Sequence, residues 1–140
     1  MNARGEPIPE DVVKFFDGKM LLGYVATARP DSELAIVPMG VVIHEGLVRI
    51  STPSDTFKVR NLRQDPHIAV CMPYPEDPRR YLLIRGAAEV VEDHGGRFID
   101  WVVRSHMGLE EHPHEPPGTP RVVITVIPEH FLFSGAQGAI

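Results

Sequence analysis

The chain has 140 residues, 43% hydrophobic and 24% charged, a balance that predicts one globular domain over residues 1–140 and excludes a disordered chain. Its formal net charge of −5 at pH 7 argues against a nucleic-acid-binding protein, although a local basic pocket for a small anion is compatible with it. No apolar run suits a membrane helix or a signal peptide, and the single cysteine cannot form an internal disulfide, so we expect a cytoplasmic protein.

The first part of the chain predicts a short helix followed by three strands. The helix is expected within residues 1–18, where Pro9 stands in the first turn and Gly18 follows an apolar helical stripe. Strand patterns follow at 20–28, 33–43 and 47–51. The second pattern is interrupted at Pro38 and Gly40, because proline removes a ladder donor and glycine often marks a bulge or a close backbone approach.

The second part of the chain alternates strands with two further helices. One helix is expected from a cap at Ser54 or Asp55 to Pro66, which ends it. Gly86 lies inside a long strand pattern and predicts a bulge. The segments after the helix are a strand at 67–72, a proline-broken loop at 73–78, a strand at 81–91, a helix at about 94–107, an exposed loop at 109–120, and a strand at 121–127. Residues 131–133 are apolar enough to extend this last strand past Pro128.

Six short strands with few crossover helices predict a mainly β fold. Too few helices alternate with the strands for a parallel Rossmann sheet. A six-stranded antiparallel barrel with small helices at its ends is the natural closure, because a closed sheet leaves no exposed edges.

A candidate anion site lies where the third strand passes into the following helix. Ser51 and Thr52 end the strand, and Thr56 and Lys58 fall at the start of the helix. Free N–H groups at a helix N-terminus favour an anion, and a hydroxyl with a lysine would complete a phosphate pocket without a P-loop. The same residues are also typical of a simple helix cap beside a solvated lysine, so the spacing alone leaves both interpretations open.

Blocks of residues spread over most of the chain resemble the pyridoxamine 5′-phosphate oxidase-like split-barrel family, in the branch that binds FMN or coenzyme F420, a deazaflavin. The blocks are 23–27, 37–40, 51–52, 58–66, Tyr81 with 84–90, and 120–123. The resemblance implies a split β-barrel of the FMN-binding type. It also implies a homodimer with the cofactor sites at the interface.

The resemblance assigns roles to residues of the second and third strands. By position, Ile50, Ser51 and Thr52 would line the ring and ribityl region of the cofactor. Pro38, Met39 and Gly40 would lie against the tricyclic ring, where proline and glycine keep the backbone close.

The resemblance also assigns the phosphate and the anionic tail to the helix that follows. Thr56 and Lys58 would hold the phosphate, whereas Phe57 stands where relatives often carry a basic residue, which weakens the case for FMN. Arg60 and Arg63 would add charge for the longer anionic tail of F420. Arg63 has an alternative partner in Asp65.

The resemblance implies an F420H2-dependent reductase of a planar, small-molecule acceptor, in which the cofactor carries the chemistry and no catalytic side chain is assigned. The alternatives are an FMN-dependent oxidoreductase of the same fold, a non-catalytic protein that binds flavin, deazaflavin or a tetrapyrrole, and a cofactorless scaffold. Oxidation of vitamin B6 is not expected, because the C-terminal arginine and histidine of true pyridoxamine phosphate oxidases are missing.

Two other groups of residues have structural interpretations. His106, His112 and His114 lie in or beside a proline-rich loop without fixed ligand spacing, so no metal site is expected. Cys71 lies in an apolar run and is expected to be a buried structural thiol.

We expect Trp101 to lie on the face of its helix that packs against the core. A role at the dimer interface is the alternative. Arg79 and Arg80 follow Glu76 and Asp77, and we expect these four residues to form a solvated charge cluster.

Overall fold

The structure is a computed structural model that describes residues 8–16, 20–113, 115–116 and 118–134. Its strands are β1 (Leu21–Ala28), β2 (Leu34–His44), β3 (Leu47–Pro53), β4 (His67–Tyr74), β5 (Asp77–Glu92) and β6 (Arg121–Ser134). Its helices are α1 (Glu10–Phe16), α2 (Phe57–Gln64) and α3 (Arg97–His106), with a short 3-10 turn, η1 (His94–Gly96), before α3.

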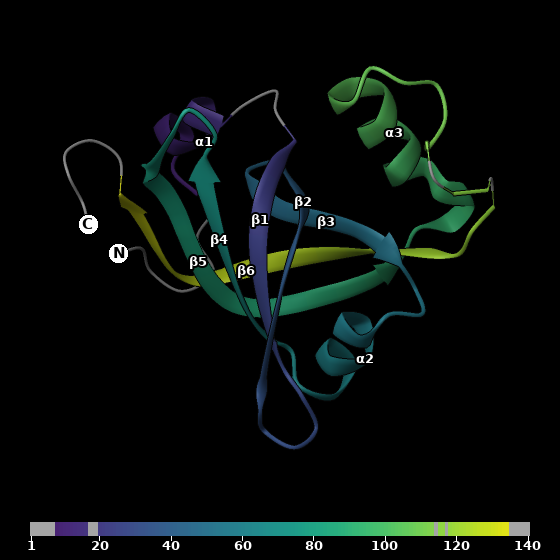
Figure 1. The fold of residues 1–140 in the computed structure, drawn as a ribbon, viewed down its shortest axis with the longest axis horizontal. Helices are drawn as coiled ribbons and strands as arrows, with labels where there is room; N and C mark the ends of the chain where they lie inside the picture. The colour runs from purple at the N-terminus through teal and green to yellow at the C-terminus, as the bar shows by residue number, and fades with distance from the viewer. Residues whose placement is uncertain (1–7, 17–19, 114, 117, 135–140) are drawn as a thin grey trace.

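The six strands form a closed antiparallel barrel in the order β1-β2-β3-β6-β5-β4 (Figure 1). Alternate residues of each strand point inward, and the valine, leucine and isoleucine side chains among them fill the core. The expected mainly β, six-stranded antiparallel split barrel is therefore confirmed.

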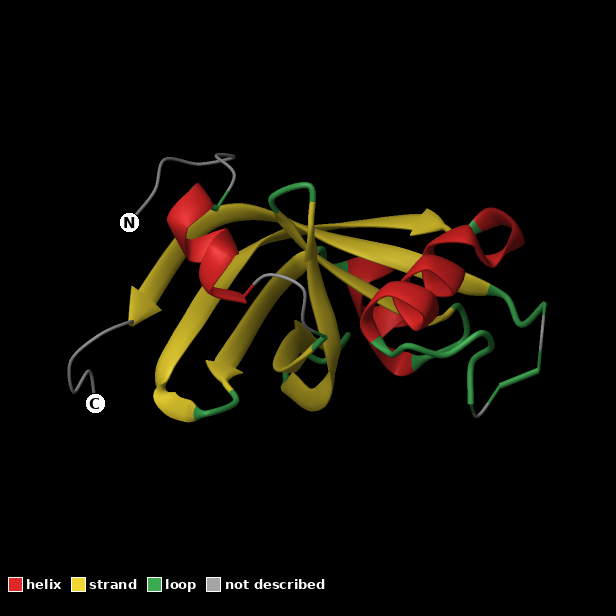
Figure 2. Ribbon diagram, turned by 90° about the horizontal axis from the view of Figure 1, so that it is seen from above, coloured by secondary structure: helices red, strands yellow, loops and turns green. Residues whose placement is uncertain are grey.

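Helices lie at the two ends of the barrel, as Figure 1 and Figure 2 show. At one end, α1 inserts Val12 and Phe16 into the core. It lies within the expected 1–18 range, although Gly18 is outside the described residues. At the other end lie α2 and α3, beside the adjoining ends of β3 and β6. No helix among the described residues is long and apolar enough to cross a membrane.

The expected interruption of β2 at Pro38 and Gly40 is wrong, because β2 pairs with β1 without a break through both residues. β3 pairs with β2 only at residues 42–44, so Pro38 lies where β2 has a single neighbouring strand and the missing N–H is tolerated. A close approach at Gly40 is confirmed, since an added Cβ would lie 2.5 Å from the side-chain methyl group of Met20.

The predicted bulge at Gly86 is confirmed. The register between β5 and β6 shifts between Arg85 and Gly86, opposite Pro128. A Cβ added at Gly86 would lie 2.0 Å from the carbonyl oxygen of Ile127, so this backbone contact requires glycine. Because the bulge accommodates Pro128, β6 continues through the proline to Ser134.

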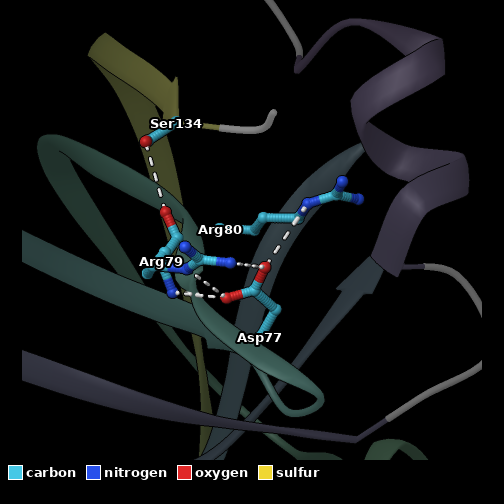
Figure 3. A network of polar contacts seen from close by, with 4 residues as sticks. All are labelled: Asp77, Arg79, Arg80 and Ser134. Carbon is cyan, nitrogen blue, oxygen red and sulfur yellow. Dashed lines mark hydrogen bonds and ion pairs between the residues drawn. The ribbon is translucent and has the colours of Figure 1, made fainter. Parts of the chain in front are cut away.

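The hairpin between β4 and β5 corrects the expected loop at 73–78. β4 continues to Tyr74 and β5 begins at Asp77, because the Asp77 carboxylate organises the turn (Figure 3). It accepts a hydrogen bond from Arg79 Nε at 3.1 Å and lies 3.8 Å from Arg80 Nε, while Ser134 Oγ donates to the Arg79 carbonyl at 3.4 Å. This confirms the solvated cluster for Asp77, Arg79 and Arg80, and the Arg79 hydrogen bond lowers the pKa of Asp77.

α3 is held against the barrel by its cap and by an aromatic cluster. The Asp93 carboxylate accepts hydrogen bonds from the backbone N–H groups of Phe98 and Ile99 at 2.9 and 3.0 Å. The half-buried ring of Trp101 lies 4.5 Å from the ring of His44 in β2, between centroids. Trp101 therefore packs α3 onto the barrel.

An apolar row crosses the outer face of five strands. Cross-strand pairs join Pro38 to Tyr24, Tyr24 to Cys71, Cys71 to Leu83, and Leu83 to Leu132. Tyr24, Leu83 and Leu132 are 39%, 36% and 47% exposed, which leaves a continuous apolar surface. Cys71 lies half-buried in this row instead of in the core, and partial burial raises the pKa of its thiol.

Candidate functional site

The start of α2 differs from the sequence-based expectation in a way that matters for the site. The residue at the cap position is Thr56, with extended backbone angles, and not Ser54 or Asp55. The first helical hydrogen bond runs from the Arg60 N–H to the Thr56 carbonyl at 3.1 Å. The Thr56 side chain makes no capping hydrogen bond, so the N–H groups of the first turn are not satisfied by it.

Thr56 carries a buried hydroxyl group, Oγ1, that makes no hydrogen bond within the described structure. Thr56 is one of the residues around a cavity of about 500 Å³, called the α2 cavity here, whose lining residues are Thr27, Ala35, Val37, Asp55, Thr56, Phe57, Lys58, Arg60 and Asn61. Because buried hydroxyls are nearly always paired, an unpaired one beside a cavity indicates a ligand contact.

Lys58 supplies the positive charge of the α2 cavity. The side chain is half-buried, and within the described part of the chain its ammonium makes no ion pair. Burial lowers the pKa of Lys58, and the nearby positive charge of Arg121 lowers it further. An anion bound in this cavity would relieve both effects.

A buried hydrogen bond fixes α2 on the barrel. Asn61 Nδ2 in α2 donates to Thr27 Oγ1 in β1 at 3.0 Å, and both side chains are almost fully buried. Both residues also line the α2 cavity. This contact between residues distant in sequence helps to set the position of Thr56 and Lys58, and no local sequence pattern predicts it.

The remaining α2 residues lie on the outer side of the site. Arg60 forms an ion pair with Asp55 and lies 4.6 Å over the centroid of the Phe57 ring, which is 78% exposed. Arg63 is exposed and lines no cavity described for the chain. The alternative pairing of Arg63 with Asp65 is wrong, because Asp65 pairs with His67.

Four of the other predicted residues, Met39, Gly40, Ser51 and Thr52, line a second cavity, between β3 and α3. This α3 cavity measures about 360 Å³. Its lining residues are Met20, Met39, Gly40, Val42, Arg49, Ser51, Thr52, Pro53, Ile99, Val102, Met107, His112, Glu115 and Arg121.

The structure thus divides the predicted residues. Met39, Gly40, Ser51 and Thr52 line the α3 cavity, whereas the predicted α2 residues other than Arg63 line the α2 cavity. Pro38 is exposed on β2, between lining residues of the two cavities. Ile50 is fully buried in the barrel core, so its side chain lines neither cavity.

Arg121 lines the α3 cavity, and its charge also acts on Lys58 of the α2 cavity; the sequence predicts it only as part of the last strand. Its Nε donates to Ser51 Oγ at 2.9 Å, and its Nη1 lies 2.6 Å from both carboxylate oxygens of Glu115. The guanidinium is only 7% exposed, and its charge acts on Lys58. An arginine that opens a β-branched strand is a usable signal, since a buried arginine needs an anionic partner.

The histidines do not gather into a metal-ligand set in the described ranges, where no group of three or more His, Cys, Asp or Glu side chains could hold an ion. His112 lines the α3 cavity with Glu115, whereas His106 lies against the Trp101 ring. His114 lies outside the described residues. Apart from His112 and Glu115, most of the described part of the 109–120 loop is exposed, as expected.

Comparison with solved structures gives several similar folds. An F420 reductase shares 29% identity over 89% of this chain and 98% of its own, with a TM-score of 0.74. A conserved hypothetical protein from Mycobacterium tuberculosis shares 20% identity over 94% of this chain and 88% of its own, with a TM-score of 0.70. A pyridoxamine 5′-phosphate oxidase-related, FMN-binding protein from Nostoc punctiforme shares 14% identity over 79% of this chain and 71% of its own, with a TM-score of 0.57.

No curated protein sequence matches the chain. The family model for pyridoxamine 5′-phosphate oxidase, in contrast, matches residues 8–135, which include all six strands and both cavities. The match agrees with the closed antiparallel barrel and with the blocks noted in the sequence. The chain therefore belongs to the pyridoxamine 5′-phosphate oxidase family.

Proposed function

We propose that the protein is an F420H2-dependent oxidoreductase that reduces a planar organic acceptor. The observation that carries this proposal is the buried, unpaired hydroxyl of Thr56 beside the half-buried ammonium of Lys58. Together they offer a donor and a positive charge at the first turn of α2, where the helix dipole also favours an anion.

The residues of the α2 cavity fit the phosphate of a flavin-type cofactor. A phosphate would accept hydrogen bonds from Thr56 Oγ1 and from the N–H groups of the first turn, and it would compensate the charge of Lys58. The ring would lie toward Met39, Gly40, Ser51 and Thr52 in the α3 cavity. When bound, the reduced cofactor supplies the hydride, and the protein supplies position and electrostatics.

F420 is favoured over FMN by two observations. Phe57 places an exposed aromatic ring where a second basic residue would strengthen an FMN phosphate site. The F420 reductase is also similar to this chain over nearly the whole of both proteins, at 29% identity. Arg60 and the exposed Arg63 would then face the anionic tail of F420 outside the cavity.

We also propose that the chain forms a homodimer through the apolar row on its outer face. The row from Pro38 to Leu132 covers five strands and carries no charged side chain, which is typical of the core of a protein interface. Pro38 belongs both to this row and to the predicted ring contacts, so a partner would lie near the cofactor. With Cys71 as the only cysteine, a reducing, cytoplasmic location suits the proposal.

The test of the proposed activity is turnover with a defined set of acceptors. F420H2 and reduced FMN are each mixed with the protein and a panel of quinones without oxygen, and oxidation is followed by absorbance. Oxidation of F420H2 that requires the protein supports the proposal. Tight binding of F420 without oxidation by any acceptor would favour a carrier, and turnover with reduced FMN alone would favour the FMN enzyme.

A further inference from the structure

Ser51 brings a hydroxyl group from β3 to the α3 cavity. Its neighbours Ile50 and Thr52 are buried, so the alternation of the strand turns the Ser51 side chain to the outer face of the barrel. Ser51 itself is half-buried and lines the α3 cavity. The hydroxyl is the only polar group of this side chain, so its hydrogen bonds decide what Ser51 offers to a bound molecule.

Arg121 contacts the Ser51 hydroxyl from the neighbouring strand. β6 pairs with β3 so that Arg121 lies opposite Pro53, two residues from Ser51. Arg121 Nε donates a hydrogen bond to Ser51 Oγ at 2.9 Å, and Arg121 Nη1 donates to both carboxylate oxygens of Glu115 at 2.6 Å. The Arg121 side chain is only 7% exposed. A buried guanidinium that is bonded on two sides keeps one orientation, so the Ser51 oxygen has a fixed donor.

The contact with Arg121 determines which hydrogen bonds Ser51 can still make. A guanidinium carries donors and no acceptor, so the Ser51 proton cannot be given back to Arg121. Within the described ranges, Ser51 donates to no other residue. The charge of Arg121 also polarises the hydroxyl, because a group that accepts a charge-assisted hydrogen bond donates its own proton more strongly. The proton of Ser51 is therefore left for a molecule in the α3 cavity.

The rest of the α3 cavity suits a planar ligand with acceptor atoms at its edge. Large apolar side chains contact the faces of a ring system, and a single polar group then fixes the orientation of the ring. A flavin or deazaflavin has nitrogen and carbonyl oxygen acceptors on its pyrimidine ring, which match a donor at Ser51. The large apolar lining residues are Met20, Met39, Val42, Ile99, Val102 and Met107.

We propose that Arg121 is a positioning residue that holds Ser51 as a hydrogen-bond donor to an acceptor atom at the edge of the cofactor ring. The role of Arg121 rests on the proposed function, because that function places the ring in the α3 cavity. Glu115 fixes Arg121 in turn. Ser51 thereby selects a ring that presents a nitrogen or a carbonyl oxygen at this edge, since an N–H group there would face a second donor.

The hydrogen bond between Arg121 and Ser51 is tested first, by ¹H–¹⁵N NMR on the full chain without cofactor. We expect a resolved Arg121 Nε–H signal in the parent, and faster exchange of this proton with water in Ser51→Ala. Ser54→Ala removes a serine that lines neither cavity, so exchange should stay at the parent's rate. Equal exchange in the parent and Ser51→Ala would overturn the proposal, and the comparison requires no variant of Arg121 to fold.

F420 binding then tests whether Ser51 donates to the ring. Ser51→Ala should lose about tenfold in F420 affinity and should shift the absorption band of the bound ring, because both depend on the hydrogen bond. Ser51→Thr keeps a hydroxyl and should restore both, whereas Ser54→Ala should change neither. Parental affinity with an unshifted band in Ser51→Ala would overturn the proposal.

A double-mutant cycle tests whether Arg121 acts through Ser51. Arg121→Lys keeps the charge that acts on Lys58 and removes the Nε–H group, so it should shift the band in the same direction as Ser51→Ala. In the Ser51→Ala background, Arg121→Lys should cause no further loss of F420 affinity. Arg97→Lys changes an exposed arginine outside both cavities and should match the parent. Additive losses in the double variant would overturn the proposal.

The role of Arg121 and the proposed function fail separately. A protein that binds F420 with the band shift that depends on Ser51, but oxidises F420H2 with no acceptor, contradicts the proposed function alone. A protein that oxidises F420H2 and shows additive losses in the cycle contradicts the role of Arg121 alone.

Discussion

Thr56 and Lys58 each carry a side-chain polar group that the described part of the protein leaves unpaired. The Thr56 hydroxyl is buried without an acceptor or donor, and the Lys58 ammonium is partly desolvated beside Arg121. Both conditions reduce the stability of the ligand-free protein, and the proposed bound anion would relieve both. Such a conflict between stability and ligand binding is common at functional sites.

Thr56→Val tests this conflict directly. Valine keeps the shape of threonine and removes the unpaired hydroxyl, so the free energy of unfolding should rise by about 1 kcal/mol while F420 affinity falls about tenfold. Urea unfolding and fluorescence titration measure the two effects. Thr27→Val is the matched control: the Thr27 hydroxyl accepts a hydrogen bond from Asn61, so this variant should lose stability. Equal losses in both variants would contradict the account.

Lys58 predicts a dependence on pH in the alkaline range. Its pKa in the folded protein lies below the ordinary 10.5, so between these two values the unfolded chain binds more protons and stability rises with pH. Anion affinity should fall over the same window, because the ammonium form binds the phosphate. Urea unfolding and F420 titration from neutral pH to 10.5 measure both trends. Lys58→Met should flatten both, and an unchanged profile in that variant would assign them to another group.

Many residues of the candidate site could be predicted from the sequence. Their distribution over two separate cavities could not. A hydroxyl and a lysine at a helix start are a local pattern, so Thr56 and Lys58 were within reach of the sequence. For Arg121 the sequence offers only an arginine at the start of a β-branched strand; its partner Ser51 is 70 residues away and is brought near by the pairing of β3 with β6. The sequence also does not show that Ser51 and Thr52 line a different cavity from Thr56.

At the scale of elements, the bulge in β5 determines how far the barrel extends. Gly86 lets the backbone of β5 approach Ile127, and the register shift lets β6 pass through Pro128. The long β5 and β6 strands then carry Arg121 to one end of the barrel and Ser134 to the other. The pairing of β6 with β3 then places Arg121 opposite Pro53, next to Ser51.

Gly86→Ala should lower the free energy of unfolding by about 3 kcal/mol, because a methyl group would overlap the Ile127 carbonyl. Thermal or urea unfolding measures the change. Gly108→Ala is the control, because Gly108 has a positive φ but open space around it, and it should cost only about 1 kcal/mol of backbone strain. Similar losses for the two variants would show that the contact at Gly86 is relaxed by a small shift.

The strands themselves were largely predictable, because alternation of apolar residues and turn signals are local. The errors came from proline. Pro38 and Pro73 each suggested an interruption, yet both lie within strands, whereas β6 continues past Pro128 as residues 131–133 indicated. Whether proline is tolerated depends on which side of a strand is paired and where a bulge falls, and both are set by neighbours distant in sequence.

At the scale of the whole molecule, the exposed apolar row is the clearest sign of assembly. A monomer would leave Tyr24, Leu83 and Leu132 in water, across five strands of one face. Burial of this row against a second copy would place two sets of cavities in one assembly.

Leu83→Glu should convert the dimer to a monomer, because it places a charge in the middle of the row. Sedimentation velocity measures the change in mass. Leu109→Glu introduces the same charge at an exposed leucine in the loop after α3 and should leave the dimer intact. A parent protein that sediments as a monomer, or a Leu83→Glu dimer of unchanged affinity, would contradict the proposed interface.

The most direct test of the central claim is a titration of the parent protein, Lys58→Gln and Lys14→Gln with F420 and FMN side by side, followed by cofactor fluorescence. Lys14 is an exposed lysine paired with Glu10, so its variant controls for the loss of one positive charge. We expect the parent to bind F420 more tightly than FMN, and Lys58→Gln alone to lose about tenfold in affinity. Full F420 affinity in Lys58→Gln, or no binding of either cofactor by the parent, would contradict the central claim.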